Sequence, residues 1–400
     1  MANKSLDIKN KNNSQNNQSV QSKISDSLSK ISGLNKNSVS SNVGNNIDNK
    51  SLLNSNSLLN NDTKVNIITE NYLLILSFVI AFIIFVLIYF FSKSFRVSRT
   101  LDTFKIYQKY QNISSFDYIK RGNVELCKCR IASAYNACHN GYQIFDYTSE
   151  DITLGLIQSG VRYLEFNIFN SEFGKKANPV ISMGYKKGEW KLTLTDTRLE
   201  YCLNIIANNA FKTNDGDSGC PNPDDPIFIG LNLNNNNNLD CLNIVADLLT
   251  DYFGERFIDN KYSFQSSDDI PFIKMKFLLG KVVIFASDGF QGSRLEELVN
   301  YSWDNITNNK NHKMQRIHHT YFDDPKFNSD ELIEFNKTGL TIVIPNKEGD
   351  FWSSNYDCMK ALDYGCQFVT MNYQYIDDNI DKYITTFKNK SILVKPKELQ

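Results

Sequence analysis

The chain has 400 residues, a formal net charge of −1 at pH 7, and 41% hydrophobic and 12% aromatic residues. This near-neutral balance excludes the strongly basic surface typical of nucleic-acid-binding domains, so we expect no nucleic-acid partner. The length suits two or three domains, or one α/β barrel with additional segments.

Residues 1–65 form a low-complexity segment. They contain 16 Asn, 14 Ser and no aromatic residue. A segment of this composition cannot bury enough apolar surface to offset the entropy lost on ordering. We therefore predict a disordered N-terminal tail.

Residues 72–91 form a run of twenty residues without a charge, a glycine or a proline. At a rise of about 1.5 Å per residue, a helix of this length spans the roughly 30 Å hydrocarbon core of a bilayer. A buried helix of a soluble core is the alternative, but this run is apolar on every face. Tyr72 and Tyr89 lie where interfacial aromatic residues are usual. The run predicts one transmembrane helix.

The basic residues that flank this run are distributed unevenly. The twenty residues before it contain only Lys64, and the twenty after it contain five basic residues: Lys93, Arg96, Arg99, Lys105 and Lys109. The positive-inside rule then predicts a single-pass membrane protein with its C-terminal part in the cytoplasm and its tail in the lumen or exterior. We assign residues 92–126 to a basic juxtamembrane linker that could contact anionic, including phosphoinositide, lipids. A cytoplasmic location agrees with reading all eight cysteines as reduced thiols.

From residue 127 onward, apolar strand-like runs alternate with helix-like segments. The predicted strands lie near residues 129–133, 162–168, 179–183, 226–232, 281–286, 316–321, 340–345 and 366–372. The predicted helices are Asp151–Ser159, Leu199–Ala210, Cys241–Phe253 and Leu295–Trp303. Eight strands alternating with helices predict an α/β fold of the (β/α)8 TIM-barrel type.

Three of these strands end in polar residues, as expected where buried strands open into a site. Cys129–Cys138 reads CRIASAYNAC, Tyr163–Phe169 reads YLEFNIF and Pro179–Tyr185 reads PVISMGY. Their order and spacing resemble the X region of eukaryotic-type phosphoinositide-specific phospholipase C. In that family the first strand ends in Ser-His-Asn, the second in Glu-x-Asp, and the third in a His before Gly.

Further segments extend the resemblance over the X and Y regions of that family. They are Pro226–Asn232, Leu279–Ser287, Leu295–Tyr301, Ser353–Tyr356, Gly365–Gln374 and Ile392–Leu399. The resemblance implies an X-like half barrel over residues 127–287 and a Y-like half barrel over residues 295–400.

At the positions that carry the family's chemistry, Asn136 and Glu165 match the family and the other positions hold different residues. The two catalytic His positions hold Tyr135 and Met183. The four Ca²⁺ positions hold Asn136, Glu165, Asn167 and Asn232. The substrate-contacting Lys, Lys, Arg and Tyr positions hold Phe285, Ser287, Ile342 and Ile344. Tyr and Met are poor replacements for imidazole in acid–base work, and one carboxylate in place of three should weaken Ca²⁺ binding sharply.

Three hypotheses follow from the resemblance and its departures. The first is a membrane-anchored, catalytically inactive phospholipase C-like protein that binds a lipid head group or a protein partner. The second is an active phosphoric diester hydrolase that acts on phosphatidylinositol-type lipids. Its relocated base could be His318 or His319, near a predicted strand end, whereas His139 lies four residues past the family's position and does not replace it. The third is a structural or assembly membrane protein. We expect no cofactor under the first hypothesis, and Ca²⁺ only if activity remains.

Overall fold

The computed structural model describes residues 55–171, 176–186, 190–264, 270–303, 313–347 and 349–400. Its contacts divide the chain into two compact units, and the division falls between Phe82 and Ile83.

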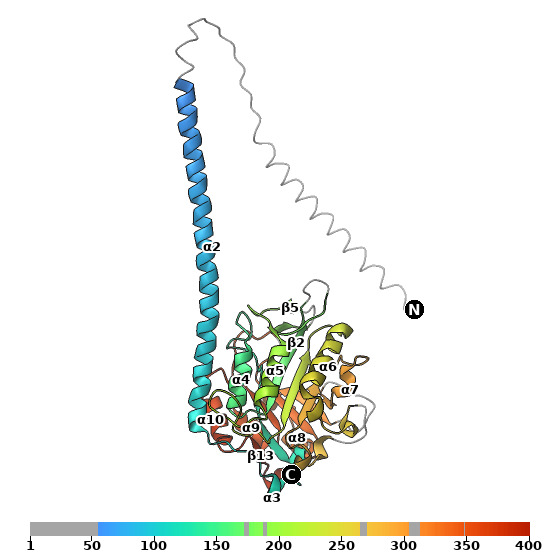
Figure 1. Ribbon diagram of the computed structural model, residues 1–400. Coiled ribbons are helices and arrows are strands. Elements are labelled where there is room, and N and C mark those ends of the chain that lie inside the picture. Colours follow the sequence, from blue (N-terminus) through green and yellow to red (C-terminus); the bar gives the residue numbers. More distant parts are fainter. Residues whose placement is uncertain (1–54, 172–175, 187–189, 265–269, 304–312, 348) are drawn as a thin grey trace, which may run out of the picture. The chain divides into compact units, whose positions relative to one another are not determined.

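The first described element is one long helix, α2, which runs from Ser55 to Tyr110 (Figure 1). Residues 1–54, most of the tail that we predict to be disordered, lie outside the described residues. Residues 55–65 are helical instead, because extending an existing helix adds one hydrogen bond for each residue fixed. The part Asn71–Tyr110 is long and apolar enough to cross a membrane, by length and composition, and none of its most apolar 18-residue window is buried.

The C-terminal part of α2, from Ile83 onward, belongs to the same compact unit as the strands. Phe104 and Tyr107 are buried there, and the Thr100 hydroxyl donates to Asn140 Oδ1 at 2.7 Å. The segment 92–110, which we assign to a linker from the sequence, is therefore helical and packed. Its contacts include Gly155 of helix α4 (Glu150–Gln158), whose missing side chain leaves room for the Phe104 ring.

Replacing Gly155 by Ala should destabilise this helix contact. A Cβ at residue 155 would lie 2.3 Å from Phe104 Cδ2, and overpacking of this kind costs about 1–3 kcal/mol. Thermal unfolding of the full chain in detergent measures the loss. Gly254→Ala is the control, because its nearest neighbour would lie 3.9 Å away and its φ of −48° suits any residue. Equal unfolding temperatures for the two variants would contradict the close contact.

Eight parallel strands form a nearly closed barrel, which confirms the predicted fold class. They are β1 (Cys129–Ala134), β2 (Tyr163–Asn170), β7 (Ile227–Leu233), β8 (Val282–Ala286), β9 (Tyr301–Ser302), β10 (Met314–His318), β11 (Leu340–Ile344) and β12 (Phe368–Met371). Each strand except β9 pairs with the next barrel strand in chain order, and β12 pairs back to β1. Within the described residues, no ladder joins β9 to β10.

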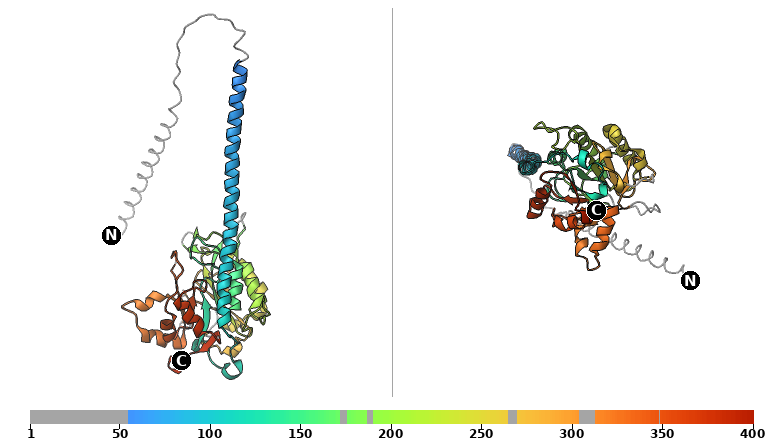
Figure 2. Two further views of the ribbon diagram at one scale, coloured as in Figure 1. Left: turned by 90° about the vertical axis from the view of Figure 1, so that its left-hand side faces the viewer. Right: turned by 90° about the horizontal axis from the view of Figure 1, so that it is seen from below.

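The remaining elements cover the barrel and its two ends (Figure 2). Besides α4, the helices are α3 (Tyr118–Arg121), α5 (Leu199–Asn209), α6 (Leu239–Phe253), α7 (Leu295–Leu298), α8 (Ser329–Thr338), α9 (Cys358–Asp363) and α10 (Asp378–Thr386). The short strands are β3 (Pro179–Ile181), β4 (Gly184–Tyr185), β5 (Trp190–Lys191), β6 (Thr197–Arg198) and β13 (Ile392–Val394).

Two of the predicted elements are wrong. The run at 179–183 is not a barrel strand, because β3 pairs antiparallel with β2 in a hairpin. The true fifth barrel strand is β9, inside Leu295–Trp303, of which only Leu295–Leu298 is helical. A short apolar run does not reveal which partner it pairs with, and the β-branched and aromatic residues after position 298 favour a strand.

The barrel interior is filled by aromatic side chains. The Phe228 and Phe285 rings stack at 5.8 Å between centroids, and Tyr163 and Phe368 approach to 5.1 Å. All four side chains are fully buried. As in other barrels of this class, the interior is a packed core, so that any site lies at a mouth.

Candidate active site

A cavity of about 180 Å³ lies at the barrel end where the strands finish. Its lining comprises Tyr135, Asn167, Met183, Gly184, Lys186, Asn232, Asn234, Trp303, Arg316, Ile344 and Asn346. The fold therefore brings together five of the residues singled out from the sequence, and it does so at the end of the barrel where sites of this fold class form.

A chain of side-chain amides crosses this mouth. Asn232 Nδ2 donates to Asn167 Oδ1 at 2.7 Å, and Asn167 Nδ2 donates to Asn136 Oδ1 at 2.7 Å. Asn136 Nδ2 in turn donates to Gln143 Oε1 at 2.8 Å, and Gln143 Nε2 donates to Ser353 Oγ at 2.9 Å. The first three contacts each join an NH₂ group to an amide oxygen, and the fourth ends on a hydroxyl oxygen. The side-chain oxygens of Asn136 and Asn167, at two predicted Ca²⁺ positions, therefore already accept hydrogen bonds from neighbouring amides.

The fourth predicted position, Glu165, is held by Arg316 of β10. Arg316 Nη2 lies 2.6 Å from Glu165 Oε1, and the Tyr163 hydroxyl donates to Glu165 Oε2 at 3.0 Å. The Glu165 side chain is fully buried, and that of Arg316 is 16% exposed. Burial alone would lower the pKa of the Arg316 guanidinium, but the Glu165 carboxylate raises it on balance.

Arg316 is the functional-site residue that the sequence did not reveal. The guanidinium lies 6.0 Å from the Tyr135 ring centroid and 5.6 Å from that of Trp303, at the centre of the mouth. The available signal was an Arg inside a predicted strand, where a long cation must find a partner if it points inward.

These residues do not fit a Ca²⁺ ion. Calcium requires six to eight oxygen ligands, several of them usually carboxylates. Here the single carboxylate is paired with Arg316, and the oxygens of Asn136 and Asn167 already accept amide hydrogen bonds. Across the described parts of the chain, no three His, Cys, Asp or Glu side chains gather so that they could hold a metal.

The two histidine positions of the family also lie at this mouth. Burial raises the pKa of Tyr135 to about 12, against the opposing effect of Arg316. Met183 Sδ accepts a hydrogen bond from Asn167 at 3.0 Å and carries no exchangeable proton. Neither residue can exchange a proton near neutral pH, which general acid–base catalysis requires.

His139 and the two candidate relocated bases, His318 and His319, lie elsewhere. His139 is 1% exposed, and neither ring nitrogen has a hydrogen-bond partner among the described residues. Burial lowers its pKa to about 3. The His318 ring contacts Pro345 O and Thr320, and the His319 ring stacks on Tyr356. None of the three lines the mouth cavity.

The four positions predicted to contact substrate are mostly structural. Phe285 and Ile342 belong to the barrel core and are fully buried. Ser287 Oγ accepts from the Leu233 backbone NH at 2.8 Å. Only Ile344 reaches the cavity, where it adds an apolar wall.

Replacing Asn167 by Ala should cost about 2 kcal/mol of folding free energy, because it leaves the buried Asn136 oxygen and the Asn232 NH₂ group without their partners. Thermal unfolding of the full chain measures this cost. Asn208→Ala, which removes an exposed amide contact to Asn204, is the control and should change stability by less than about 0.5 kcal/mol. If the two variants unfold alike, the amide chain has no structural role.

Comparisons with known proteins agree with this fold. The family model for the phosphatidylinositol-specific phospholipase C X domain matches residues 123–288, and the Y-domain model matches residues 283–397. Crystal structures of PLC21 from L. pealei and from S. officinalis each align with a TM-score of 0.57 at 20% identity. Each alignment covers 70% of this chain and 38% of that protein.

A comparison with curated proteins gives no match. The chain spans less than half the length of the two PLC21 structures, and at this identity they support the fold alone. The two domain matches together cover most of the chain and coincide with the two halves of the barrel. The chain therefore belongs to the phosphatidylinositol-specific phospholipase C family.

Proposed function

We propose that this chain is a membrane-anchored, catalytically inactive phospholipase C-like protein that binds a phospholipid head group at its barrel mouth. The observation that carries the proposal is the mouth itself. At the metal positions, the Glu165 carboxylate is paired with Arg316, and the oxygens of Asn136 and Asn167 accept hydrogen bonds from neighbouring amides. Tyr135 and Met183 stand at the acid–base positions.

The loss of activity follows from the size of the missing effects. One positioned general acid or base contributes about 10²–10⁴-fold to a rate, so losing two such groups removes most of the catalysis. The metal's stabilisation of charge in the transition state is lost in addition. A folded barrel mouth with these residues can still bind a phosphate without cleaving its ester.

Head-group binding is supported by the polarity of the cavity. The Arg316 guanidinium remains partly exposed, and the lining adds the amides of Asn232, Asn234 and Asn346. A guanidinium with neighbouring amides is well suited to phosphate and hydroxyl oxygens. The volume of about 180 Å³ suits part of a head group rather than a whole lipid.

Membrane anchoring is supported by α2 and by the loops around the mouth. Tyr89, in the last turn of the apolar run, donates to Leu194 O at 3.2 Å and packs on Tyr147 at 5.8 Å. Large apolar side chains are exposed on the paired strands β4 and β5 (Tyr185 and Trp190) and on neighbouring loops (Phe145, Leu194, Phe351 and Trp352). Exposed aromatic residues of this kind favour a membrane interface. Cytoplasmic placement of the barrel rests on the basic residues after the span.

Binding is tested by titrating the detergent-solubilised full chain with dioctanoylphosphatidylinositol and measuring its unfolding temperature. We expect stabilisation of the wild type, with the lipid recovered intact. The matched variant is Glu165→Gln/Arg316→Met, which removes the Arg316 guanidinium from the mouth while the Gln oxygen still accepts from Tyr163. An equal response of this variant would place the lipid elsewhere. No stabilisation of either protein would favour a protein partner or a structural role.

The predicted topology is tested separately by adding protease to sealed membrane vesicles with the cytoplasmic face outward. We expect the barrel to be digested and the tail before the span to be protected. Digestion of the tail with protection of the barrel would reverse the orientation.

A further inference from the structure

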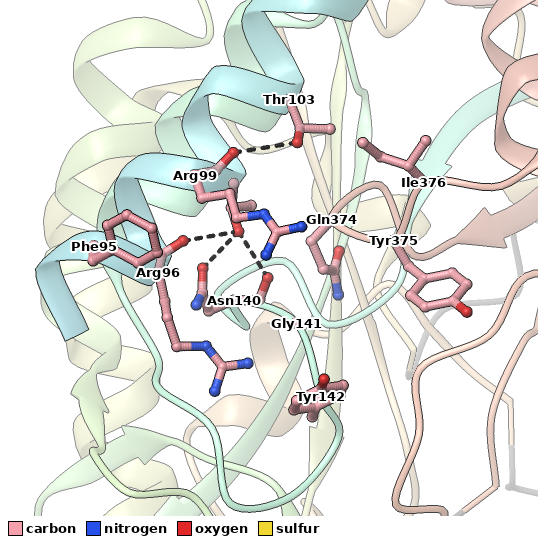
Figure 3. Close-up of a pocket in the computed structure, with 11 residues that line it drawn as sticks. Phe95, Arg96, Arg99, Thr103, Asn140, Gly141, Tyr142, Gln374, Tyr375 and Ile376 are labelled. Atoms are coloured by element: carbon pink, nitrogen blue, oxygen red, sulfur yellow. Dashed lines mark hydrogen bonds between the residues drawn. The ribbon is translucent and has the colours of Figure 1, made fainter. Parts of the chain in front are cut away.

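A second and larger cavity, of about 310 Å³, lies between α2 and two loops at the barrel mouth (Figure 3). From α2 it is lined by Phe95, Arg96, Arg99, Thr100 and Thr103. The loop after β1 contributes residues 140–142, and the loop after β12 contributes residues 374–376. All of these residues belong to the compact unit that begins at Ile83. The cavity is separate from the mouth cavity, because the two share no lining residue.

The two arginines of this groove differ in their partners. Arg96 Nη2 lies 2.8 Å from Asp146 Oδ2, and its guanidinium lies 5.0 Å from the Tyr142 ring centroid. The Arg99 guanidinium has no hydrogen-bond or ion-pair partner in the described part of the chain. Figure 3 shows it directed into the space between Asn140 and Gln374. The groove therefore contains one uncompensated positive charge next to two side-chain amides, an arrangement that suits an anionic oxygen group.

The groove is also amphipathic. Phe95 is 71% exposed and Ile376 is 58% exposed, and both belong to the lining that carries the arginines. A soluble anion would leave these apolar surfaces in water, whereas a lipid would cover them. The volume of about 310 Å³ lies within the range of small-molecule sites.

The position of the groove along α2 matches the depth of lipid phosphates. Arg96 and Arg99 follow Phe91, the end of the apolar run, by five and eight residues, or roughly 7 and 12 Å along the helix axis. The head-group layer is roughly 5–7 Å thick on each side of the bilayer. Side chains on a helix tilt toward its N-terminus, and long Arg side chains extend toward the interface. Both guanidinium groups can therefore reach the phosphate level.

We propose that this groove binds the head group of an anionic phospholipid through its phosphate, with Arg99 as the principal contact and Phe95 and Ile376 against the lipid's glycerol and upper acyl region. The inference rests on the membrane placement in the proposed function, but not on loss of catalysis. A bound lipid bridges the juxtamembrane helix and two mouth loops, so it holds the barrel at a fixed height above the bilayer.

The test is a binding titration of the detergent-solubilised full chain with dioctanoylphosphatidic acid. Binding is measured as the change in unfolding temperature. Dioctanoylphosphatidylcholine, whose phosphate is neutralised by its own choline, and glycerol 3-phosphate, the soluble counterpart, are the comparison probes. We expect phosphatidic acid to bind at least tenfold more tightly than either. Equal binding of glycerol 3-phosphate would overturn the lipid assignment and leave a soluble-phosphate site.

Arg99→Gln should weaken binding of phosphatidic acid about tenfold, because a charge-assisted contact to phosphate is lost. The affinity of Arg99→Lys, which keeps the charge but not the two-pronged guanidinium donor, should lie between those of the wild type and Arg99→Gln. Lys109→Gln, which removes an exposed charge elsewhere on α2, should bind as the wild type does. Unchanged affinity in Arg99→Gln would overturn the proposal.

The mouth variant Glu165→Gln/Arg316→Met separates this proposal from the proposed function. If it loses phosphatidic acid binding while Arg99→Gln retains it, the lipid sits in the mouth and the groove proposal is overturned. If only Arg99→Gln loses binding, the groove proposal is supported whatever the mouth binds.

Discussion

Arg316→Met should lower the free energy of unfolding by about 3–5 kcal/mol, the largest loss that we expect from a single substitution at the mouth. The Glu165 side chain is fully buried, and its carboxylate lies 2.6 Å from the Arg316 guanidinium. Without Arg316, the Glu165 carboxylate keeps only the Tyr163 hydroxyl as a hydrogen-bond partner among the described residues. A buried carboxylate without a compensating cation must either remain charged at high cost or take up a proton.

The double variant Glu165→Gln/Arg316→Met distinguishes a pairing effect from a packing effect. It removes both charges together and leaves the Tyr163 hydroxyl an amide oxygen as acceptor. Because buried ion pairs can often be replaced by neutral groups at little cost, we expect most of the lost stability to return. Thermal or denaturant unfolding of the full chain in detergent measures both. If the double variant is as unstable as Arg316→Met, the loss comes from packing around residue 316.

His139→Met should make the protein less sensitive to acid. Burial lowers the pKa of His139 to about 3, whereas an exposed His in the unfolded chain titrates near 6.5. Between these two values the unfolded state binds a proton that the folded state does not. Stability therefore falls by about 1.4 kcal/mol for each pH unit below 6.5, which amounts to about 2 kcal/mol at pH 5.

The measurement is the unfolding temperature of both proteins from pH 8 to pH 4. At pH 8 the variant should be at least as stable, because it removes two buried nitrogen atoms that lack partners. The difference should widen in favour of the variant below pH 6.5. The remaining histidines are common to both proteins and cancel in the difference. Parallel curves across this range would show that residue 139 takes up its proton without unfolding.

Much of the barrel could be predicted from the sequence, because buried parallel strands are near-continuous apolar runs. Seven of the eight barrel strands were identified in this way. The hairpin strand β3 was mistaken for a barrel strand, since PVI has the same composition as a central strand and pairing is a tertiary property. The two-residue strand β9 was too short to show a periodicity.

The residues of the mouth could be predicted only through family resemblance. The match to the family's motifs placed Tyr135, Met183, Asn167 and Asn232 at one site, and the structure brings all four to one cavity. The sequence could not show that the amides bind one another or that Arg316 pairs with Glu165. Such contacts depend on which strands face each other across the mouth. Glu165 on β2 and Arg316 on β10, for example, are far apart in the sequence and are not on paired strands.

The central claim is that these internal contacts have replaced the catalytic site. The most direct test measures inositol phosphate released from phosphatidylinositol vesicles by the reconstituted full chain, with and without Ca²⁺, beside an active phospholipase C. We predict no release above background from the wild type. We predict none from Tyr135→His/Met183→His either, because the side chains at the metal positions still bind one another and Arg316 rather than Ca²⁺. Ca²⁺-dependent release by the wild type would contradict the account and would require a base outside the mouth residues described above.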